Sequence, residues 1–366
     1  MNKGKNHIIF CSTSIADYDR RIHRIIRALL SDGYKISWIS RKDDPDFSIE
    51  GITHIDVNSI FKSGFLFYAI INFKLFYHLL AKRKTVISAV DLDTVLSAFL
   101  VSKFTGRTLI FDSHEYFPEV PELLNRKGIK NFWMILGAKI CPQIEYNYTV
   151  GPSLQEIFAE KYNVPYHTIL NIDHDAKQAL DLRNRKFNQM IYLGVINEGR
   201  GIEIAIESLR LLPQKNLLII GDGDLTVNMK ALAIDLNVSD RVKFLGYIQP
   251  KDIANYLENS WIGINLLDNQ SLSYYYSLAN KYFDYIHAQL PCISMNFPEY
   301  SKIQGKCGCG VLIENYAIKD FVSAVKQLEN KELYNSCVNG CVIAAKEYNW
   351  SIEKSKLLTL YEQWLA

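Results

Sequence analysis

Short runs of apolar residues alternate with amphipathic stretches along most of the chain. In the first half, the amphipathic stretches 21–30 and 93–104 predict helices. Apolar runs predict strands at 7–11, 35–40, 85–90, 108–111 and 146–150. Runs without polar alternation are typical of parallel strands that are buried on both faces of a sheet. The first half is therefore predicted to be a doubly wound α/β domain.

The same alternation restarts after the polar segment 173–188, in whose neighbourhood we expect the linker. Helices are predicted at 202–212, from Pro250 onwards, at 279–288 and at 351–365. Strands are predicted at 190–193, 217–220, 242–245, 262–267 and 291–295. The chain is therefore expected to form two α/β units of similar size, at 1–168 and 169–349, followed by a last helix at 350–366.

Charge and composition limit the classes of partner. The formal net charge of the 366 residues is +2, which is too small for a general nucleic-acid binder. Residues 1–110 contain 16 basic and 10 acidic residues, so this part carries +6 and the remainder −4. This weak asymmetry favours an anionic partner or an anionic membrane face for the first half.

Cysteines and apolar runs indicate the compartment. The seven cysteines are scattered, and the pair Cys307 and Cys309 has no second pair or histidine cluster nearby, so we expect buried thiols rather than a zinc site. No apolar run reaches the roughly 18 residues of a membrane span, and the run near the N-terminus is too short for a signal peptide. We therefore expect a cytoplasmic protein.

Two basic side chains are expected at helix starts in the second unit, where acids are usual. Arg200 follows the strand predicted at 190–193, and Lys281 opens the helix predicted at 279–288. A cation there costs about 0.3–1 kcal/mol, and a bound phosphate removes this cost because it pairs with the side chain and accepts from helix N–H groups. Two such positions predict a diphosphate site. The alternative is that each cation is solvated or paired locally, Lys281 with Asp284.

Further residues of the second unit fit a nucleotide. Asp284 lies one turn beyond Lys281 on the same predicted helix face, where a carboxylate can accept from a ribose diol. Gly221 and Gly223 follow the strand predicted at 217–220 and leave room for close backbone approach. The chain contains neither a GxGxxG fingerprint nor a GxxxxGK[ST] loop, which disfavours nicotinamide enzymes and P-loop ATPases.

In the first half, His114 follows the strand predicted at 108–111. Ligands of open α/β sheets bind outside the carboxyl ends of the strands, so this histidine is placed to contact a sugar hydroxyl or a leaving phosphate. A structural histidine is the alternative. Arg21 opens the helix predicted at 21–30 and is a weaker candidate for a phosphate or acceptor contact, because Asp17 and Asp19 would also neutralise it.

Seven segments together resemble the GT-B glycosyltransferases, of the family 4 type that uses nucleotide sugars and retains anomeric configuration. They occur in the order of that family and span nearly the whole chain. The segments are 19–24, 91–94, 111–119, 192–203, 219–223, 242–247 and 279–285.

The resemblance implies a fold of two Rossmann-like domains that face a central cleft, with the last helix packing on the first domain. It implies that the donor nucleotide binds the second domain, with Arg200 and Lys281 on the diphosphate, Asp284 on the ribose and the base near Gly246–Ile248. His114 matches the histidine that faces the transferred sugar. The remaining expected donor contacts are Gly194, Gly221, Gly223, Tyr247, Asn280 and Tyr276.

The resemblance implies a sugar transferase (EC 2.4 class) that acts on a glycan or lipid-linked hydroxyl in bacterial surface polysaccharide assembly. The nucleotide sugar is a substrate, so neither a cofactor nor a metal is expected. Tyr276 stands where the family has the first acid of its E-x7-E motif, and Ser12-Thr13-Ser14 replaces its first glycine-rich loop. The alternatives are a nucleotide-sugar 2-epimerase of the same fold and a non-catalytic nucleotide-binding partner subunit.

Residues 61–84 are rich in Phe and Tyr. Their basic residues are Lys62, Lys74, Lys82, Arg83 and Lys84. We favour a buried helix of the first unit for this segment. The alternative is an amphipathic segment that dips into an anionic bilayer, so that the protein contacts the inner face of the membrane peripherally.

Overall fold

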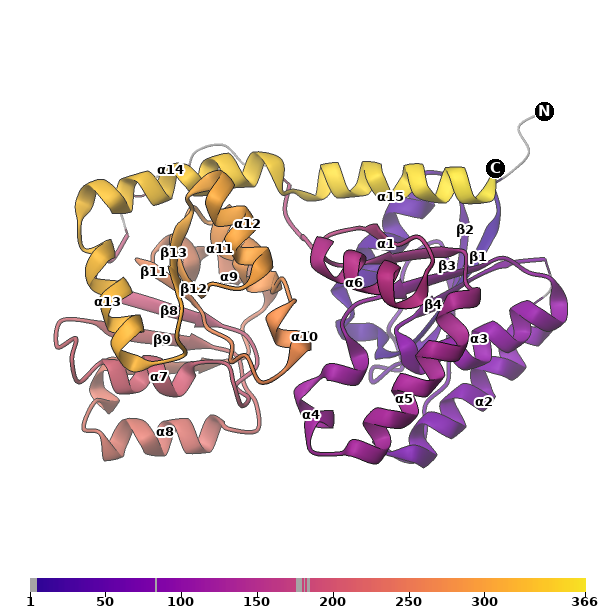
Figure 1. The fold of residues 1–366 in the computed structure, drawn as a ribbon, viewed down its shortest axis with the longest axis horizontal. Coiled ribbons are helices and arrows are strands. Elements are labelled where there is room, and N and C mark those ends of the chain that lie inside the picture. Colours follow the sequence, from indigo (N-terminus) through magenta and orange to yellow (C-terminus); the bar gives the residue numbers. More distant parts are fainter. Residues whose placement is uncertain (1–4, 83, 176–179, 181, 183–184) are drawn as a thin grey trace. The chain divides into compact units, whose positions relative to one another are not determined.

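The computed structural model describes residues 5–82, 84–175, 180, 182 and 185–366. The chain divides into two compact units (Figure 1). Unit 1 comprises Met1–Asn171 and Glu353–Ala366, and unit 2 comprises Ile172–Ile352. The sequence had placed these boundaries at 168/169 and 349/350. Arg83 and part of the expected linker lie outside the described residues.

Unit 1 contains a seven-stranded parallel sheet in the order β3-β2-β1-β4-β5-β6-β7. Its strands are β1 (His7–Ile15), β2 (Lys35–Arg41), β3 (Ile52–Asp56), β4 (Val86–Val90), β5 (Leu109–Ser113), β6 (Tyr146–Thr149) and β7 (His167–Thr168). Its α-helices are α1 (Arg20–Ser31), α2 (Phe65–Ala81), α3 (Leu92–Thr105), α4 (Pro121–Leu124), α5 (Lys127–Ile140) and α6 (Pro152–Tyr162).

Unit 2 contains a six-stranded parallel sheet in the order β10-β9-β8-β11-β12-β13. Its strands are β8 (Gln189–Leu193), β9 (Asn216–Ile220), β10 (Val242–Gly246), β11 (Ile262–Asn265), β12 (Cys292–Met295) and β13 (Gly310–Ile313). Its helices are α7 (Ile202–Ser208), α8 (Thr226–Asp235), α9 (Pro250–Glu258), α10 (Leu272–Tyr275), α11 (Asn280–His287), α12 (Pro298–Cys307), α13 (Ile318–Leu328) and α14 (Lys331–Glu347).

Both sheets reverse their strand order at one point, between β1 and β4 in unit 1 and between β8 and β11 in unit 2. Such a switch point leaves a crevice outside the carboxyl ends of the strands, where ligands of open α/β sheets bind. The doubly wound prediction is confirmed for both halves of the chain. The switch points direct attention to the residues that follow β4 and β8.

The last helix, α15 (Trp350–Leu365), completes unit 1. The fully buried Tyr361 lies against Tyr148 of β6 with ring centroids 6.3 Å apart, and its hydroxyl is 3.4 Å from that of Ser88 in β4. The Glu353 carboxylate accepts the backbone N–H of Leu170 at 2.8 Å. The terminal segment therefore packs on the first sheet, as the resemblance implied.

Several expectations about the elements were wrong in detail. β1 continues through Ser12–Ile15, which the sequence had placed in a loop. Strands β3, β7 and β13 were missed, and β3 lacks an apolar run because it is a partly exposed edge strand. Helix α7 ends at Ser208 rather than at 212, because the chain leaves the helix in turns before Pro213.

Candidate functional site

Lys281 lies at the switch point of unit 2 with its charged end buried. The residue is only 6% exposed, and its ammonium nitrogen lies 3.8 Å from the centroid of the Tyr192 ring. A Cβ atom placed on Gly194, directly after β8, would lie 3.4 Å from the same nitrogen. This nitrogen has no hydrogen-bond partner among the described residues. Because buried cations are normally paired, the arrangement fits an absent anionic partner.

The structure brings Arg200 and Lys281 together, as the sequence predicted. Burial lowers the pKa of Lys281 well below its ordinary value, the charge of Arg200 lowers it further, and Asp284 opposes both effects. The Arg200 guanidinium stacks on the Tyr274 ring at 4.7 Å, and its buried Nε also has no partner among the described residues. Two adjacent cations of this kind repel each other until an anion binds between them.

The start of α7 differs from the expected phosphate site. The backbone N–H of Gly201 donates to the Tyr316 hydroxyl at 2.6 Å, and that hydroxyl donates to Glu203 at 2.5 Å. Tyr316 follows β13, so it could not be found from the sequence around α7. This contact satisfies one of the N–H groups that a phosphate was expected to use.

The glycines after β8 and β9 meet each other. Gly221 has φ +128°, and a Cβ atom on it would lie 2.0 Å from the carbonyl oxygen of Gly194. A Cβ atom on Gly223 would lie 2.5 Å from the carbonyl oxygen of Ile196. The sequence had explained these glycines by approach of a ligand. In the structure they let two neighbouring loops pack backbone against backbone, which fixes the position of Gly194 beside Lys281.

Asp284 is bound to a residue that the sequence did not single out. Its Oδ1 accepts a hydrogen bond from His174 Nε2 at 2.7 Å, and both side chains are largely buried. The local pair with Lys281, which was the alternative for that cation, is not formed. A carboxylate has about four acceptor positions, so Asp284 keeps room for further donors.

The other expected donor contacts lie around α10, α11 and β10. Asn280 is the exposed first residue of α11. Tyr276 is half-buried after α10, with its ring 4.9 Å from that of Tyr275. Tyr247 directly follows β10 and is 68% exposed. Among the described residues, no hydrogen bond joins these three side chains to the Lys281 ammonium, so their roles stay predictions.

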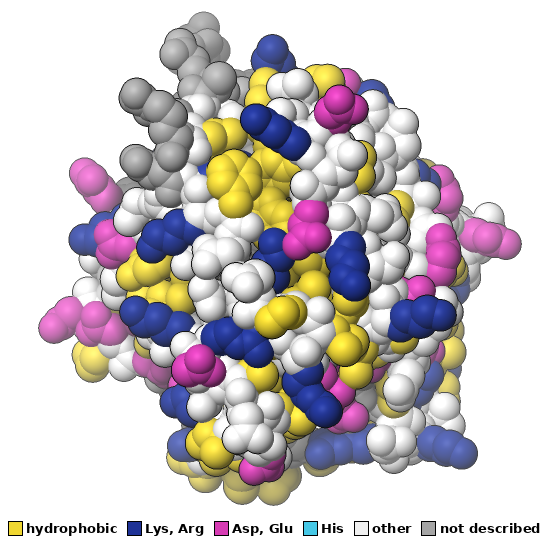
Figure 2. All heavy atoms as spheres, turned by 90° about the vertical axis from the view of Figure 1, so that its left-hand side faces the viewer, with side chains coloured by type: hydrophobic (Ala, Val, Ile, Leu, Met, Phe, Trp, Pro, Cys, Tyr) yellow, Lys and Arg dark blue, Asp and Glu magenta, His cyan; other side chains and the backbone are white. Residues whose placement is uncertain are grey.

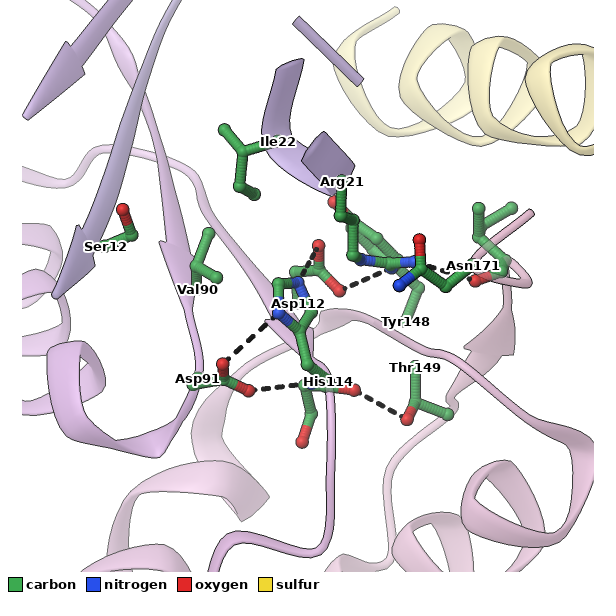
Figure 3. A network of polar contacts seen from close by, with 12 residues as sticks. Ser12, Arg21, Ile22, Val90, Asp91, Asp112, His114, Tyr148, Thr149 and Asn171 are labelled. Carbon is green, nitrogen blue, oxygen red and sulfur yellow. Dashed lines mark hydrogen bonds and ion pairs between the residues drawn. The ribbon is translucent and has the colours of Figure 1, made fainter. Parts of the chain in front are cut away.

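His114 of unit 1 lies between two carboxylates (Figure 3). Its Nε2 is 3.0 Å from Asp112 Oδ2, its Nδ1 is 3.3 Å from Asp91 Oδ2, and its backbone N–H donates to Asp91 Oδ1 at 2.7 Å. Burial alone would lower the pKa of His114, but Asp112 and Asp91 raise it to about 10. The ring is therefore an imidazolium at neutral pH.

The Arg21 guanidinium is turned inward. The residue is 6% exposed and donates to Asp112 at 2.9 Å and to the carbonyl of Ile169 at 3.3 Å. Burial would raise the pKa of Asp112, but Arg21 and His114 lower it to about 2. The guanidinium holds Asp112, which in turn holds His114, and a phosphate or acceptor contact of Arg21 stays a prediction.

Asp91, which the sequence suggested only as part of segment 91–94, organises this site. Its backbone has φ +60° and ψ 164°, a conformation that is nearly restricted to glycine and costs about 1–3 kcal/mol. The side chain does not cap α3 and points to His114 instead. The strained conformation directly after β4 therefore places a carboxylate beside the histidine at the switch point.

Two more acids surround this histidine. Burial and Asp91 raise the pKa of Asp93 to about 7, and the same two causes raise that of Glu115 to about 8. The Thr13 hydroxyl donates to Asp93 at 2.5 Å. Among the described residues, no group of three or more His, Cys, Asp or Glu side chains has the arrangement of a metal site. The acids of this cluster are thus suited to hydrogen bonding with neutral hydroxyl groups.

Comparisons with known proteins agree with this geometry. Residues 174–340 match the family described as "Glycosyl transferases group 1". A curated relative, the amylovoran biosynthesis glycosyltransferase AmsK of Erwinia amylovora, is 33% identical over 108 residues. That match covers 28% of this chain and spans about a quarter (26%) of the relative's length.

Solved structures match over nearly the whole chain. Sucrose-phosphate synthase from Thermosynechococcus elongatus is 13% identical with a TM-score of 0.80, covering 98% of this chain and 99% of that one. Anabaena Alr3699/HepE, solved in complex with UDP and glucose, is 13% identical with a TM-score of 0.70, covering 98% of each chain.

The fold and the two switch-point clusters define a two-domain α/β protein of the GT-B class. The second unit is similar to the group 1 glycosyltransferases, since the matched residues 174–340 lie entirely inside Ile172–Ile352.

Proposed function

We propose that the protein is a glycosyltransferase that moves a sugar from a nucleoside-diphosphate sugar to a hydroxyl of a glycan or lipid-linked acceptor, in bacterial surface polysaccharide assembly. The single observation that carries this proposal is the buried, unpartnered ammonium of Lys281 beside Arg200. A diphosphate would be a negatively charged partner for both cations.

The chemistry needs charge stabilisation above all. The bond between the anomeric carbon and the diphosphate breaks, and Lys281 and Arg200 stabilise the charge that develops on the leaving group, an effect that is usually the largest catalytic contribution. The acceptor hydroxyl attacks the anomeric carbon from the same face, and the leaving phosphate takes its proton. This course retains anomeric configuration. Two cations already present at the diphosphate make a metal ion unnecessary in this scheme.

In unit 1, Asp112 and Asp91 hold the positively charged ring of His114 in place. Both ring nitrogens of His114 are bound to Asp112 and Asp91, so the ring is held in one orientation. Its exposed edge and the nearby acids Asp93 and Glu115 provide contacts for sugar hydroxyls. We propose that His114 faces the transferred sugar and that Arg21 acts through Asp112 as a positioning residue.

The comparisons support a transferase. Alr3699/HepE is described in complex with UDP and glucose, and AmsK is described as a glycosyltransferase. Neither they nor sucrose-phosphate synthase is described as an epimerase or as a non-catalytic subunit. Epimerised donor sugar in the absence of acceptor would favour the epimerase, and nucleotide binding without turnover would favour the partner subunit.

The test is calorimetric titration with UDP, GDP, ADP and dTDP, followed by turnover of the corresponding sugar donors with a chelator present. We expect one nucleoside diphosphate to bind and Lys281→Met to weaken it at least tenfold. Lys215→Met is the matched control, because Lys215 also lies 3.8 Å above an aromatic ring (Trp261) but has an ion pair with Glu329. Undiminished binding and transfer by Lys281→Met would contradict the proposal.

We further propose peripheral contact with an anionic membrane through α2. The structure buries one face of this helix, with Phe67, Ile71, Leu75 and Leu79 at most 5% exposed, so the buried-helix interpretation holds for that face. The opposite face exposes large apolar side chains, namely Phe65 (77%), Leu66 (52%), Phe73 (72%), Tyr77 (65%) and Leu80 (40%). No described helix is long and apolar enough to cross a membrane.

Charge on the neighbouring elements fits an anionic surface. The sequence has no acidic residue from 57 to 90 or from 123 to 144, segments that contain α2 and α5. The two helices touch through Tyr68 and Trp133, whose ring centroids are 5.3 Å apart, and α5 exposes Ile129, Phe132 and Ile135. By contrast, Figure 2 draws the left-hand side of the view in Figure 1, where apolar side chains lie among both basic and acidic ones. Apolar insertion flanked by lysines is typical of peripheral membrane binding.

A further inference from the structure

Both chain connections between the units pass a small polar cluster beside α11. The first connection enters unit 2 at Ile172, and the second leaves it after Ile352. The backbone N–H of Trp350 donates to the carbonyl of His174 at 2.7 Å, and the Ser351 hydroxyl donates to Asp175 at 2.6 Å. The two connections are therefore tied to each other close to both boundaries.

The side chain of His174 ties this junction to α11. Its ring stacks on that of His287, with centroids 4.9 Å apart and planes at 25°, and its Nε2 donates to Asp284. His287 Nε2 in turn donates to the carbonyl of Tyr348 at 2.8 Å, which fixes the surface on which His174 stacks. Asp284 is one turn beyond Lys281 on α11, so the group that holds this acid belongs to the chain connection.

We infer that His174 is a positioning residue of the nucleotide site. It holds the Asp284 carboxylate in place for the ribose hydroxyls, and it couples nucleotide binding to the two chain connections between the units. The inference rests on the proposed function, because Asp284 meets a ribose only if a nucleoside diphosphate binds beside Lys281. The hydrogen bond from His174 uses one of about four acceptor positions of the carboxylate. A ribose diol can therefore bind while this contact persists.

Linkage makes the effect reciprocal. If the contact between His174 and Asp284 strengthens nucleotide binding, the nucleotide strengthens the contact by the same factor. The backbone N–H of Trp350 donates to His174 itself, so its hydrogen exchange reports on the junction. Nucleotide binding should slow exchange of this amide, although the nucleotide does not touch it.

The test uses the nucleoside diphosphate that the full-length wild type binds best. His174→Phe keeps a ring for stacking on His287 but removes the donor to Asp284, and we expect its dissociation constant to rise about fivefold. His174→Gln restores an N–H donor and should recover most of the affinity. Ser351→Ala is the control: it removes only the hydrogen bond to Asp175 and keeps the donor to Asp284, so its dissociation constant should stay near the wild-type value.

Hydrogen exchange gives the second readout. The nucleotide should slow exchange of the Trp350 amide in the wild type and in His174→Gln, but not in His174→Phe. Unchanged affinity of His174→Phe, or exchange at Trp350 that the nucleotide does not slow in the wild type, overturns the inference and leaves the proposed function intact. A wild type that binds no nucleoside diphosphate overturns both.

Discussion

The ammonium of Lys281 lies against the face of Tyr192 and next to the guanidinium of Arg200, with no hydrogen-bond acceptor among the described residues. An aromatic face attracts a cation, but it replaces only a small part of the hydration that burial removes. The side chain is therefore held in a state that favours loss of its proton. A diphosphate that arrives beside it reverses this preference.

This reversal predicts that nucleotide binding takes up a proton. The pKa of Lys281 is well below its ordinary value in the free protein, and a neighbouring diphosphate raises it. Calorimetric titration in two buffers of different ionisation enthalpy should show uptake approaching one proton per nucleotide at a pH above the free value. Lys281→Met should abolish the uptake and Lys215→Met should keep it. Equal uptake in wild type and Lys281→Met would contradict this assignment.

The carboxylates around His114 should control its titration. Because Asp112 and Asp91 raise the pKa of His114 to about 10, Asp91→Asn should lower it clearly. NMR titration of the labelled imidazole carbons measures this directly. Asp46→Asn, which changes an exposed acid, should leave the titration unchanged. A pKa near 6.5 in the wild type would show that the ring is not clamped as described.

Burial of Asp93 predicts a pH-dependent cost. Its folded-state pKa of about 7 exceeds the value near 3.9 expected for the unfolded chain, so the folded protein binds more protons and loses stability as pH rises from about 4 to about 7. Asp93→Asn removes this loss. Urea unfolding at pH 4.5 and pH 8 should show that the variant gains stability relative to wild type at the higher pH. A difference that does not depend on pH would refute the assignment.

Glycine at position 201 should be irreplaceable. Its φ is +70°, and an added Cβ would lie 2.3 Å from Leu266 Cβ, so Gly201→Ala should lower the free energy of unfolding by more than about 2 kcal/mol. Gly305 lies in α12 with open space around its Cα, and Gly305→Ala should raise stability by about 0.5–1 kcal/mol. Thermal or urea unfolding of the two variants provides the comparison.

The exposed face of α2 should control membrane binding. The wild type should sediment with vesicles that contain anionic lipid, less at high salt, and the double variant Phe73→Ser, Tyr77→Ser should lose most of this binding. Val227→Ser removes an equally exposed apolar side chain from unit 2 and serves as the control. The basic residues Lys82, Arg83 and Lys84 belong to the same segment of the sequence, and their substitution should reduce binding more strongly on vesicles that contain more anionic lipid. Failure of the wild type to bind anionic vesicles at low salt would exclude the surface.

Much of the fold follows from local patterns. Buried parallel strands such as β4 and β9 are continuous apolar runs, so their positions could be predicted within a residue or two. Edge strand β3 could not, because none of its five residues is buried and its sequence has no such run. The end of α7 was misjudged because Leu209 and Leu212 continue the apolar spacing in turns rather than in a helix.

Residues of the candidate site could be predicted where a side chain is unusual for its place in a helix or strand. Lys281 and Arg200 stood out because cations are disfavoured at helix starts. The inward role of Arg21 depends on Asp112, which lies 91 residues away in sequence. His174 and Tyr316 act on partners 110 and 115 residues away, and nothing in their local sequence shows those contacts. Tertiary contacts of this range are visible only in the folded chain.

The return of α15 to the first sheet has a consequence for biosynthesis. Tyr361 and Glu353 fill positions in the core and at the edge of the unit that begins at the N-terminus. A ribosome delivers these residues only after all of Ile172–Ile352 has been made. The first unit therefore emerges from the ribosome before the second but is completed after it, and its Tyr148 surface stays uncovered until α15 has been made.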